Sequence, residues 1–275
     1  MAELKTEHLE MNNSIGLDTG KNLHEIKINK RKSKKESNKE ENKFSLYQKF
    51  MAELIGSTIL VYNSCGSAVF QKDKLYAPVL SSAFCVTFLV YCFFNISGAH
   101  FNPCVSLPIY LKGSLKLKEF IFYIIAQIFG AFIGCCFIAL SNIGRFKELN
   151  ATKIQDYLIQ VNGGMNIDVW CYISCLFTET FATFMLILFV MAIGEKVNKL
   201  EPILGLAFGC LLISLIFTGC NISGSSFNPT RSLAPAVLQA LAGGDKRPLE
   251  QIWIYLIGPT IGSILAFYAW KIFKT

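Results

Sequence analysis

Six long apolar segments, separated by polar stretches, dominate the chain from residue 46 onward. They run from about Leu46 to Phe70, Pro78 to Ile96, Leu115 to Ser141, Asp168 to Ile193, Pro202 to Cys220 and Gln251 to Phe273. Each segment is near or above the roughly 20 residues that a helix needs to cross a bilayer. The pattern therefore predicts an all-α membrane protein with six transmembrane helices.

The first 43 residues have a different character, because they are polar, rich in Lys, Glu and Asn, and almost free of aromatic side chains. Such a composition is typical of a disordered segment. The first apolar run follows this polar stretch and is too long for a cleavable signal peptide, so we expect it to stay in the protein. The sequence thus predicts a disordered cytoplasmic tail at residues 1–43 and a membrane domain at residues 44–275.

The net charge of +7 indicates how the chain is oriented. A basic cluster, Lys30 to Lys35, precedes the first span and favours a cytoplasmic N-terminus. Six spans return the C-terminus, with Lys271 and Lys274, to the same side, although the opposite loops also carry Lys and Arg. A nucleic-acid-binding arm is the alternative interpretation of the cluster, and we expect no nucleic-acid partner. A plasma membrane is the expected location, with an intracellular membrane as the alternative.

An internal repeat divides the membrane domain into two halves. The segment Ile96–Pro103, ISGAHFNP, returns as ISGSSFNP at Ile222–Pro229, 126 residues later, and Glu53 returns as Glu179 at the same distance. Each half, at about 44–141 and 168–273, carries three spans. Because three is odd, the second half enters the membrane from the opposite side, which makes the chain an inverted repeat.

The two repeated segments, Ile96–Pro103 and Ile222–Pro229, are called the two boxes below, and the Asn-Pro pair that ends each of them begins a short helix. Asn is a preferred helix cap, and Pro suits the first helical position, so Asn102-Pro103 and Asn228-Pro229 mark two helix starts. The apolar stretch after each box is too short to cross a bilayer. We therefore expect two re-entrant half-helices that meet near the midplane. Short interrupted apolar segments at matching positions of two halves point to a permeation site.

The paired SGxxFNP boxes, the Glu residues on the first and fourth spans and Arg231 after the second box together resemble the aquaporin and glycerol-facilitator family. The resemblance covers residues 44–273 and implies a passive channel for water that assembles as a homotetramer. The family's usual box is Asn-Pro-Ala, whereas this chain carries Cys104 and Thr230 as the third residues. Pro108 within the first half-helix is also unusual. These departures bear on the width of the pore.

The resemblance places the narrow outer constriction at Ser82, Ile216, Ser225 and Arg231. The family's strict water channels narrow this ring with an aromatic side chain and a His, so a ring with two Ser and an Ile is expected to be wider. Glycerol, urea and ammonia are then candidate solutes beside water. Ser232 stands where glycerol facilitators typically carry Asp, which favours the water-channel pattern, so the solute range stays open.

Several other residues have a functional and a structural interpretation. Glu53 and Glu179 are expected to accept hydrogen bonds from the re-entrant loops, with a proton relay as the alternative. By the resemblance, His100 lines the cytoplasmic vestibule, with a pH switch as the alternative. Cys104 is expected to be a packing residue, with a redox or mercury-sensitive gate as the alternative.

Two other classes of function compete with a channel. An ion-coupled secondary transporter also uses inverted repeats with broken helices, but beyond Glu53, Glu179 and Arg231 the spans carry almost no ionisable groups to bind a coupling ion. An enzyme would need a nucleophile with its base or a metal cluster, and no such motif occurs. The sequence therefore predicts no catalytic residue, no metal and no cofactor. The expected partners are water, small neutral solutes and the lipid bilayer.

Overall fold

A computed structural model describes residues 44–71, 74, 76–163, 167–194 and 203–274. The tail predicted at residues 1–43 lies outside the described residues. Contacts divide the chain into a unit Met1–Ser45 and a unit Leu46–Thr275. All the elements discussed below belong to the second unit.

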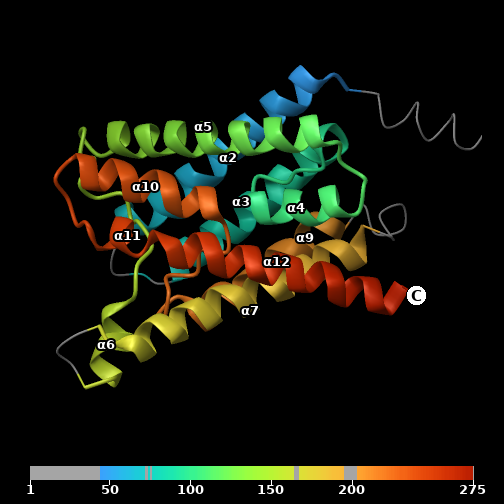
Figure 1. Ribbon diagram of the computed structural model, residues 1–275. Helices are drawn as coiled ribbons and strands as arrows, with labels where there is room; N and C mark the ends of the chain where they lie inside the picture. The colour runs from blue at the N-terminus through green and yellow to red at the C-terminus, as the bar shows by residue number, and fades with distance from the viewer. Residues whose placement is uncertain (1–43, 72–73, 75, 164–166, 195–202, 275) are drawn as a thin grey trace, which may run out of the picture. The chain divides into compact units, whose positions relative to one another are not determined.

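In its described residues, the unit Leu46–Thr275 consists of helices and their connections (Figure 1). The helices are α2 (Leu46–Phe70), α3 (Tyr76–Ser97), α4 (Pro103–Leu111), α5 (Leu117–Ser141), α6 (Asp156–Val161), α7 (Val169–Ile193), α9 (Leu204–Gly219), α10 (Pro229–Leu241), α11 (Arg247–Glu250) and α12 (Ile252–Lys274). The six predicted spans correspond to α2, α3, α5, α7, α9 and α12. The two predicted half-helices correspond to α4 and α10.

Four of the described helices, α3, α5, α7 and α12, are long and apolar enough to cross a membrane. α2 is as long as α5, with 25 residues, but it is less apolar because Glu53, Asn63 and several serines lie along its length, whereas the two charged residues of α5 stand in its first turn. α9 is apolar but shorter, with 16 residues in its described part. The weaker membrane-span signal is therefore explained by polar residues within the helix for α2 and by length for α9.

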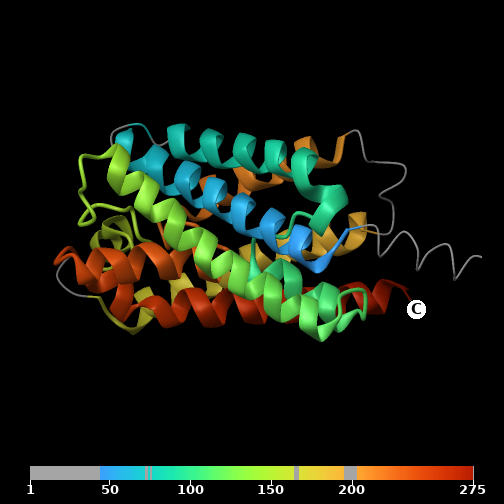
Figure 2. The same cartoon turned by 90° about the horizontal axis from the view of Figure 1, so that it is seen from above.

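The two halves pack through equivalent helix pairs and are tied together by their half-helices. α2 packs against both α3 and α5, and these three helices lie side by side in Figure 2. In the second half, α7 packs against α12 and α9. Each half-helix also contacts the third long helix of the other half, α4 against α12 and α10 against α5. The short segments are thus held between the halves.

Two glycines allow the backbones of neighbouring helices to approach each other closely. A Cβ atom on Gly130 in α5 would lie 2.4 Å from the carbonyl oxygen of Leu54, and one on Gly262 in α12 would lie 2.2 Å from that of Thr180. Leu54 and Thr180 are 126 residues apart, whereas the two glycines are 132 apart. The register between the halves therefore shifts by six residues after the boxes, because α10 is longer than α4 and is followed by α11.

Replacing Gly262 by Ala is expected to lower the thermal unfolding midpoint of the detergent-solubilised protein. The added side chain forces α7 and α12 apart, and overpacking of this kind costs about 1–3 kcal/mol. Gly66→Ala is the matched control, because a Cβ there meets its nearest neighbour at an ordinary 3.4 Å. Equal midpoints for the two variants would contradict the close contact between α7 and α12.

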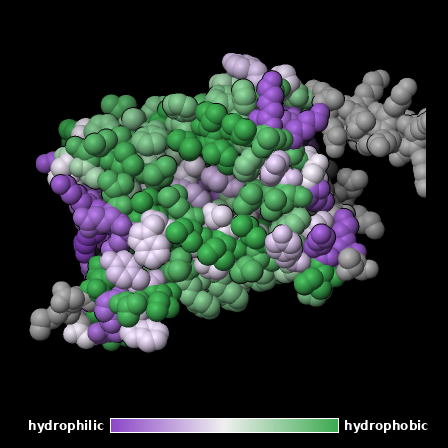
Figure 3. Space-filling view, viewed as in Figure 1, coloured by the Kyte–Doolittle hydropathy of each residue, from purple (hydrophilic) through white to green (hydrophobic). Residues whose placement is uncertain are grey.

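Large apolar side chains cover the outside of the long helices. Examples are Phe84 on α3, Phe129 on α5, Phe177 on α7, Phe217 on α9 and Tyr268 on α12, all exposed. In Figure 3, hydrophobic side chains cover the middle of the visible face, and hydrophilic ones gather toward its left and right ends. Soluble proteins rarely expose so much contiguous apolar surface. The unit is therefore an integral membrane protein.

Candidate permeation site

Glu53, buried on α2, accepts hydrogen bonds from the first re-entrant loop. Its Oε1 accepts from the hydroxyl of Ser97 at 2.6 Å and from the backbone N–H of His100 at 3.0 Å. Its Oε2 accepts from the N–H of Phe101 at 2.7 Å and from Nε2 of Gln127 at 2.8 Å. A buried carboxyl group is tolerated when its oxygens are satisfied in this way. These bonds fix the loop that leads into α4.

Glu179 on α7 makes the equivalent bonds to the second loop. Its Oε1 accepts from the hydroxyl of Ser223 at 2.7 Å and from the N–H of Ser226 at 2.9 Å, and its Oε2 accepts from the N–H of Phe227 at 2.8 Å. All three donors are displaced by 126 residues from their counterparts around Glu53. The sequence repeat therefore corresponds to a repeated hydrogen-bond pattern.

Both loops have a backbone conformation that L residues seldom adopt. Ala99 and Phe101 have φ angles of 54° and 49°, and Ser225 and Phe227 have φ angles of 51° and 55°. A left-handed conformation at non-glycine residues costs energy and persists where the surroundings enforce it. The carboxylates supply that constraint, because each bonds the N–H of one of these residues and of its chain neighbour.

Asn102 and Asn228 bring the starts of the two half-helices together. The side-chain oxygen of each accepts a backbone N–H of its own helix, Asn102 in α4 and Asn228 in α10. Their amide nitrogens donate across the repeat, from Asn102 to the carbonyl of Phe227 at 2.8 Å and from Asn228 to that of Phe101 at 2.9 Å. Each amide has a second hydrogen. The pair therefore presents two further donors where the positive ends of two helix dipoles meet.

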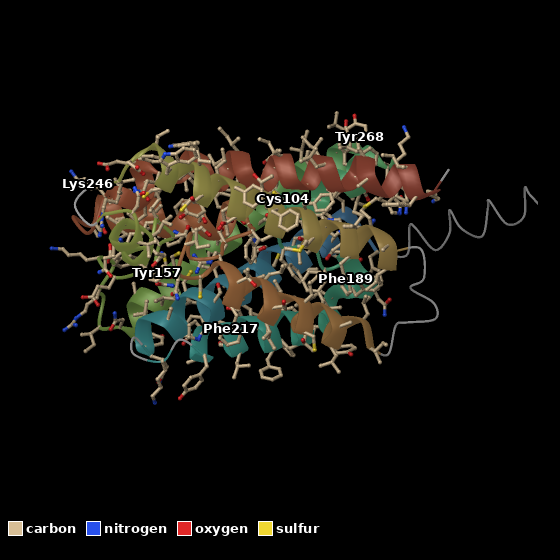
Figure 4. All side chains as sticks on the ribbon, turned by 90° about the horizontal axis from the view of Figure 1, so that it is seen from below. Cys104, Tyr157, Phe189, Phe217, Lys246 and Tyr268 are labelled. Carbon is tan, nitrogen blue, oxygen red and sulfur yellow. The ribbon has the colours of Figure 1, made fainter. Side chains whose placement is uncertain are left out.

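The other box residues do not line the cavity between the helices. Pro103 and Pro229 occupy the start of α4 and α10. Thr230 donates its hydroxyl to the side-chain oxygen of its own cap residue at 2.9 Å. Cys104 is buried, and Figure 4 shows it among the helices rather than at their ends, where Lys246 lies. Neither Cys104 nor Thr230 is among the lining residues, so their side chains do not set the cavity's width directly.

Pro108 lies inside α4, which nevertheless continues to Leu111. A proline lacks the N–H that would bond the carbonyl four residues earlier, which here belongs to Cys104. The hydroxyl of Ser263 on α12 donates to that carbonyl at 2.7 Å. The unusual proline is thus compensated by a hydrogen bond from the other half of the chain.

A cavity of about 460 Å³ runs between the two halves and past both cap residues. The sequence-predicted residues among its lining are Ser82, His100, Asn102, Ile216, Ser225, Asn228 and Arg231. The structure thus brings the four predicted filter residues and the two Asn residues to one cavity. Glu53 and Glu179 stand behind this lining as supports of the loops.

Arg231 presents an unsatisfied donor at the cavity wall. Arg231 is buried, with 7% of its surface exposed, and its Nη1 has no hydrogen-bond partner among the described residues. The hydroxyl of Ser225 donates to the carbonyl of Ile216 at 3.2 Å, and that of Ser82 donates to the carbonyl of Pro78 at 2.7 Å. Because both hydroxyl hydrogens are engaged, these serines offer only oxygen lone pairs to a solute. Donors therefore come from Arg231 and acceptors from the serines.

The wall that continues along the long helices is apolar. Leu60 and Leu186, and Val86 and Leu212, line the cavity as two pairs separated by 126 residues. His100 lines it as well, with its Nδ1 3.0 Å from the hydroxyl of Ser106. A cavity with one apolar wall and a few polar groups opposite suits small solutes that carry both hydrocarbon and oxygen atoms.

The connection between α5 and α7 contributes residues that were not predicted as pore residues. Asn150, Ala151, Thr152 and Gln155 line the cavity, and Cys220 at the end of α9 also does so. No apolar period or repeat marks these positions, because the connection has no counterpart in the other half. Their place depends on tertiary contacts that the sequence pattern does not encode.

An ion cluster joins this connection to the segment after α10. Asp245 pairs with Arg247 and with Lys153, each at 2.8 Å, and Arg247 reaches Asp156 at 3.4 Å. Hydrogen bonds from Arg247 and Lys153 hold the pKa of Asp245 well below its usual range. Asp245 therefore stays charged when the pH falls through the range in which carboxyl groups ordinarily titrate, and the cluster persists in mild acid.

Two half-helices that meet at capped N-termini inside an inverted repeat of six long helices define a membrane channel of the aquaporin type. The model of the family described as major intrinsic protein matches residues 40–270. The chain therefore belongs to the major intrinsic protein family. Members of this family are channels, so the chain is not an enzyme.

Individual relatives agree with this assignment. The chain is 30% identical to glycerol uptake facilitator protein-like 6 of Lactiplantibacillus plantarum over 226 residues, covering 82% of this chain and 97% of the relative. It is 28% identical to a probable aquaporin NIP-type of Nicotiana alata, covering 84% and 79% of the two chains. The aquaglyceroporin from Plasmodium falciparum has a similar fold, with a TM-score of 0.66, 22% identity and coverage of 82% and 95%.

Proposed function

We propose that the chain is a passive channel for water and small uncharged solutes, with its pore along the cavity at Asn102 and Asn228. The observation that carries the proposal is the meeting of two helix N-termini within that cavity. Each N-terminus brings a partial positive charge of about half a unit, and Arg231 adds a full one. These positive charges repel cations and hydronium. A neutral oxygen-bearing molecule can instead accept hydrogen bonds from the two Asn amides and from Arg231.

The solutes proposed beside water are glycerol, urea and ammonia. Ser82, Ile216 and Ser225 leave the ring around Arg231 without an aromatic side chain, which supports passage of molecules larger than water. The named relative in Lactiplantibacillus plantarum is a glycerol uptake facilitator-like protein, and this name also supports glycerol as a solute.

The assembly and orientation are part of the proposal. We infer a homotetramer in the plasma membrane, with both termini and the tail at residues 1–43 in the cytoplasm and residues 44–275 as the channel domain. Basic residues near the ends of α4, α5 and α12 support this orientation through the preference of Lys and Arg for the cytoplasmic side. They are Lys112, Lys116, Lys118, Lys271 and Lys274.

Equilibrium uptake of radiolabelled glycerol into proteoliposomes separates a channel from an ion-coupled transporter. A passive channel is expected to bring the internal concentration to the external value and no further, with or without imposed proton or sodium gradients. Empty liposomes provide the control for lipid leakage. Accumulation above the external concentration under either gradient supports coupled transport and contradicts the proposal.

Thiol modification tests whether the cavity is the pore. Of the ten cysteines, all of which lie in the described part of the chain, Cys220 is the one that lines the cavity. A mercurial or methanethiosulfonate reagent is expected to lower water permeability by at least about half, because the adduct narrows the pore. Cys220→Ser removes this sensitivity, whereas Cys104→Ser leaves it unchanged. The opposite pattern places the permeation path beside Cys104 instead.

A further inference from the structure

A chain of buried hydroxyl groups connects the α5–α7 connection to the second re-entrant loop. The hydroxyl of Thr152 lies 2.6 Å from that of Ser232, which in turn bonds the hydroxyl of Ser226. Ser226 donates to the carbonyl oxygen of Asn228 at 2.9 Å. The three hydroxyl-bearing residues are buried, with 3%, 0% and 7% of their surfaces exposed for Thr152, Ser232 and Ser226. We call this set the hydroxyl chain.

The first half contains the matching pair without the connection. His100 and Ser106 stand 126 residues before Ser226 and Ser232, and their side chains are also bonded, at 3.0 Å. There the third partner is Gln127, whose Nε2 donates to Ser106 at 3.1 Å from the rigid helix α5. In the second half the third partner comes from a connection instead. The second re-entrant loop is therefore positioned by a different element from the first.

The connection is anchored on both sides of Thr152. The backbone N–H of Leu149 donates to the side-chain oxygen of Gln239 at 3.2 Å, and that of Ile154 donates to the side-chain oxygen of Gln251 at 2.8 Å. The backbone N–H of Gln155 donates to the carbonyl of Ile222 at 3.1 Å. Between these anchors, the hydroxyl of Thr152 bonds Ser232 in α10, while Lys153 pairs with Asp245 in the segment after that helix.

We infer that residues 150–155 form a wall of the constriction and that Thr152, acting through Ser232 and Ser226, is a positioning residue for solute selectivity. The inference rests on the proposed channel function. Two residues of the hydroxyl chain are sequence neighbours of residues that line the cavity, because Ser226 follows Ser225 and Ser232 follows Arg231. Ser226 also bonds the carbonyl of Asn228. A shift of the connection therefore reaches the space beside Arg231 through side-chain hydroxyl groups, whereas Glu179 holds the same loop through the backbone N–H groups of Ser226 and Phe227.

The test compares Thr152→Val with Thr152→Ser in proteoliposomes. Valine keeps the shape of threonine but cannot bond Ser232, whereas serine keeps the hydroxyl. The ratio of glycerol to water permeability is expected to rise about threefold to fivefold in T152V, the factor expected when one hydrogen bond no longer restrains the wall. T152S is expected to retain the ratio of the unmodified chain.

Thr58→Val is the matched control. Its hydroxyl is also largely buried, but it bonds the carbonyl of Leu54 in its own helix at 2.8 Å and does not line the cavity. A general loosening of the fold would affect T58V and T152V alike, so an equal rise of the ratio in both overturns the inference. A rise in T152V alone supports it.

Ser232→Ala supplies a second, independent variant. If Thr152 acts through Ser232, the double variant T152V/S232A has the ratio of the stronger single variant rather than the product of the two changes. A double variant whose ratio equals the product of the two single changes overturns the inference.

The outcomes also separate the positioning role from the channel function. If water flux persists and the ratio of glycerol to water permeability does not change in any variant, the positioning role fails while the channel function stands. If the unmodified chain conducts no more water than empty liposomes, the channel function itself has failed.

Discussion

Glu179→Leu is expected to reduce water permeability to the level of empty liposomes. The carboxylate accepts three hydrogen bonds from the second re-entrant loop, which is held in a left-handed conformation at Ser225 and Phe227. Leaving three buried donors unpaired costs on the order of 5 kcal/mol, which is comparable to the whole stability of many domains. The loop then relaxes, and α10 no longer starts at the pore.

Two further variants separate this effect from a loss of charge in general. Glu179→Gln keeps one acceptor but turns a donor toward the N–H of Phe227, so an intermediate water permeability is expected. Glu250→Gln, at an exposed position in α11, is expected to behave as the unmodified chain. Full water flux in E179L would mean that the carboxylate does not support the loop, and the account of the second half would fail.

The double variant Ser82→Phe with Ile216→His is expected to lower glycerol permeability by about tenfold or more, with a much smaller loss of water permeability. Both side chains line the cavity that Arg231 also lines, and the added rings occupy space that a three-carbon solute needs. Stopped-flow light scattering with glycerol and with an impermeant osmolyte measures the two permeabilities on the same vesicles.

Leu80→Phe is the matched control for this pair, because it adds a ring to the same helix α3 on a side chain that is 37% exposed at the outer surface. Its glycerol and water permeabilities are expected to stay unchanged. If S82F/I216H passes glycerol as fast as the unmodified chain, these residues do not form the narrowest part of the pore.

The fold was predictable because its main determinants repeat within the sequence. Apolar segments of membrane-spanning length and the two Asn-Pro boxes locate the long helices and the half-helices. The spacing of Glu53 and Glu179 reflects the same repeat, since their hydrogen-bond donors are displaced by 126 residues as well. Features that depend on a helix period or on a repeat can be read from one chain.

Other parts of the site follow from packing and have no such signal. The six-residue register shift is visible only when Gly130 and Gly262 are seen against the helices they contact. The role of Ser263 opposite Pro108 depends on α12 lying against α4. Thr152 reaches the cavity through a connection without a counterpart, so neither periodicity nor repetition identified it.

The most direct test of the channel account is the osmotic water permeability of proteoliposomes containing the full chain, measured by stopped-flow light scattering at several temperatures. The account predicts a permeability well above that of empty liposomes and a weak temperature dependence, because water passes through a preformed cavity. It also predicts no accompanying proton current, because Arg231 and the two helix N-termini repel hydronium. A permeability equal to that of empty liposomes, or a proton current that rises with the water flux, would contradict it.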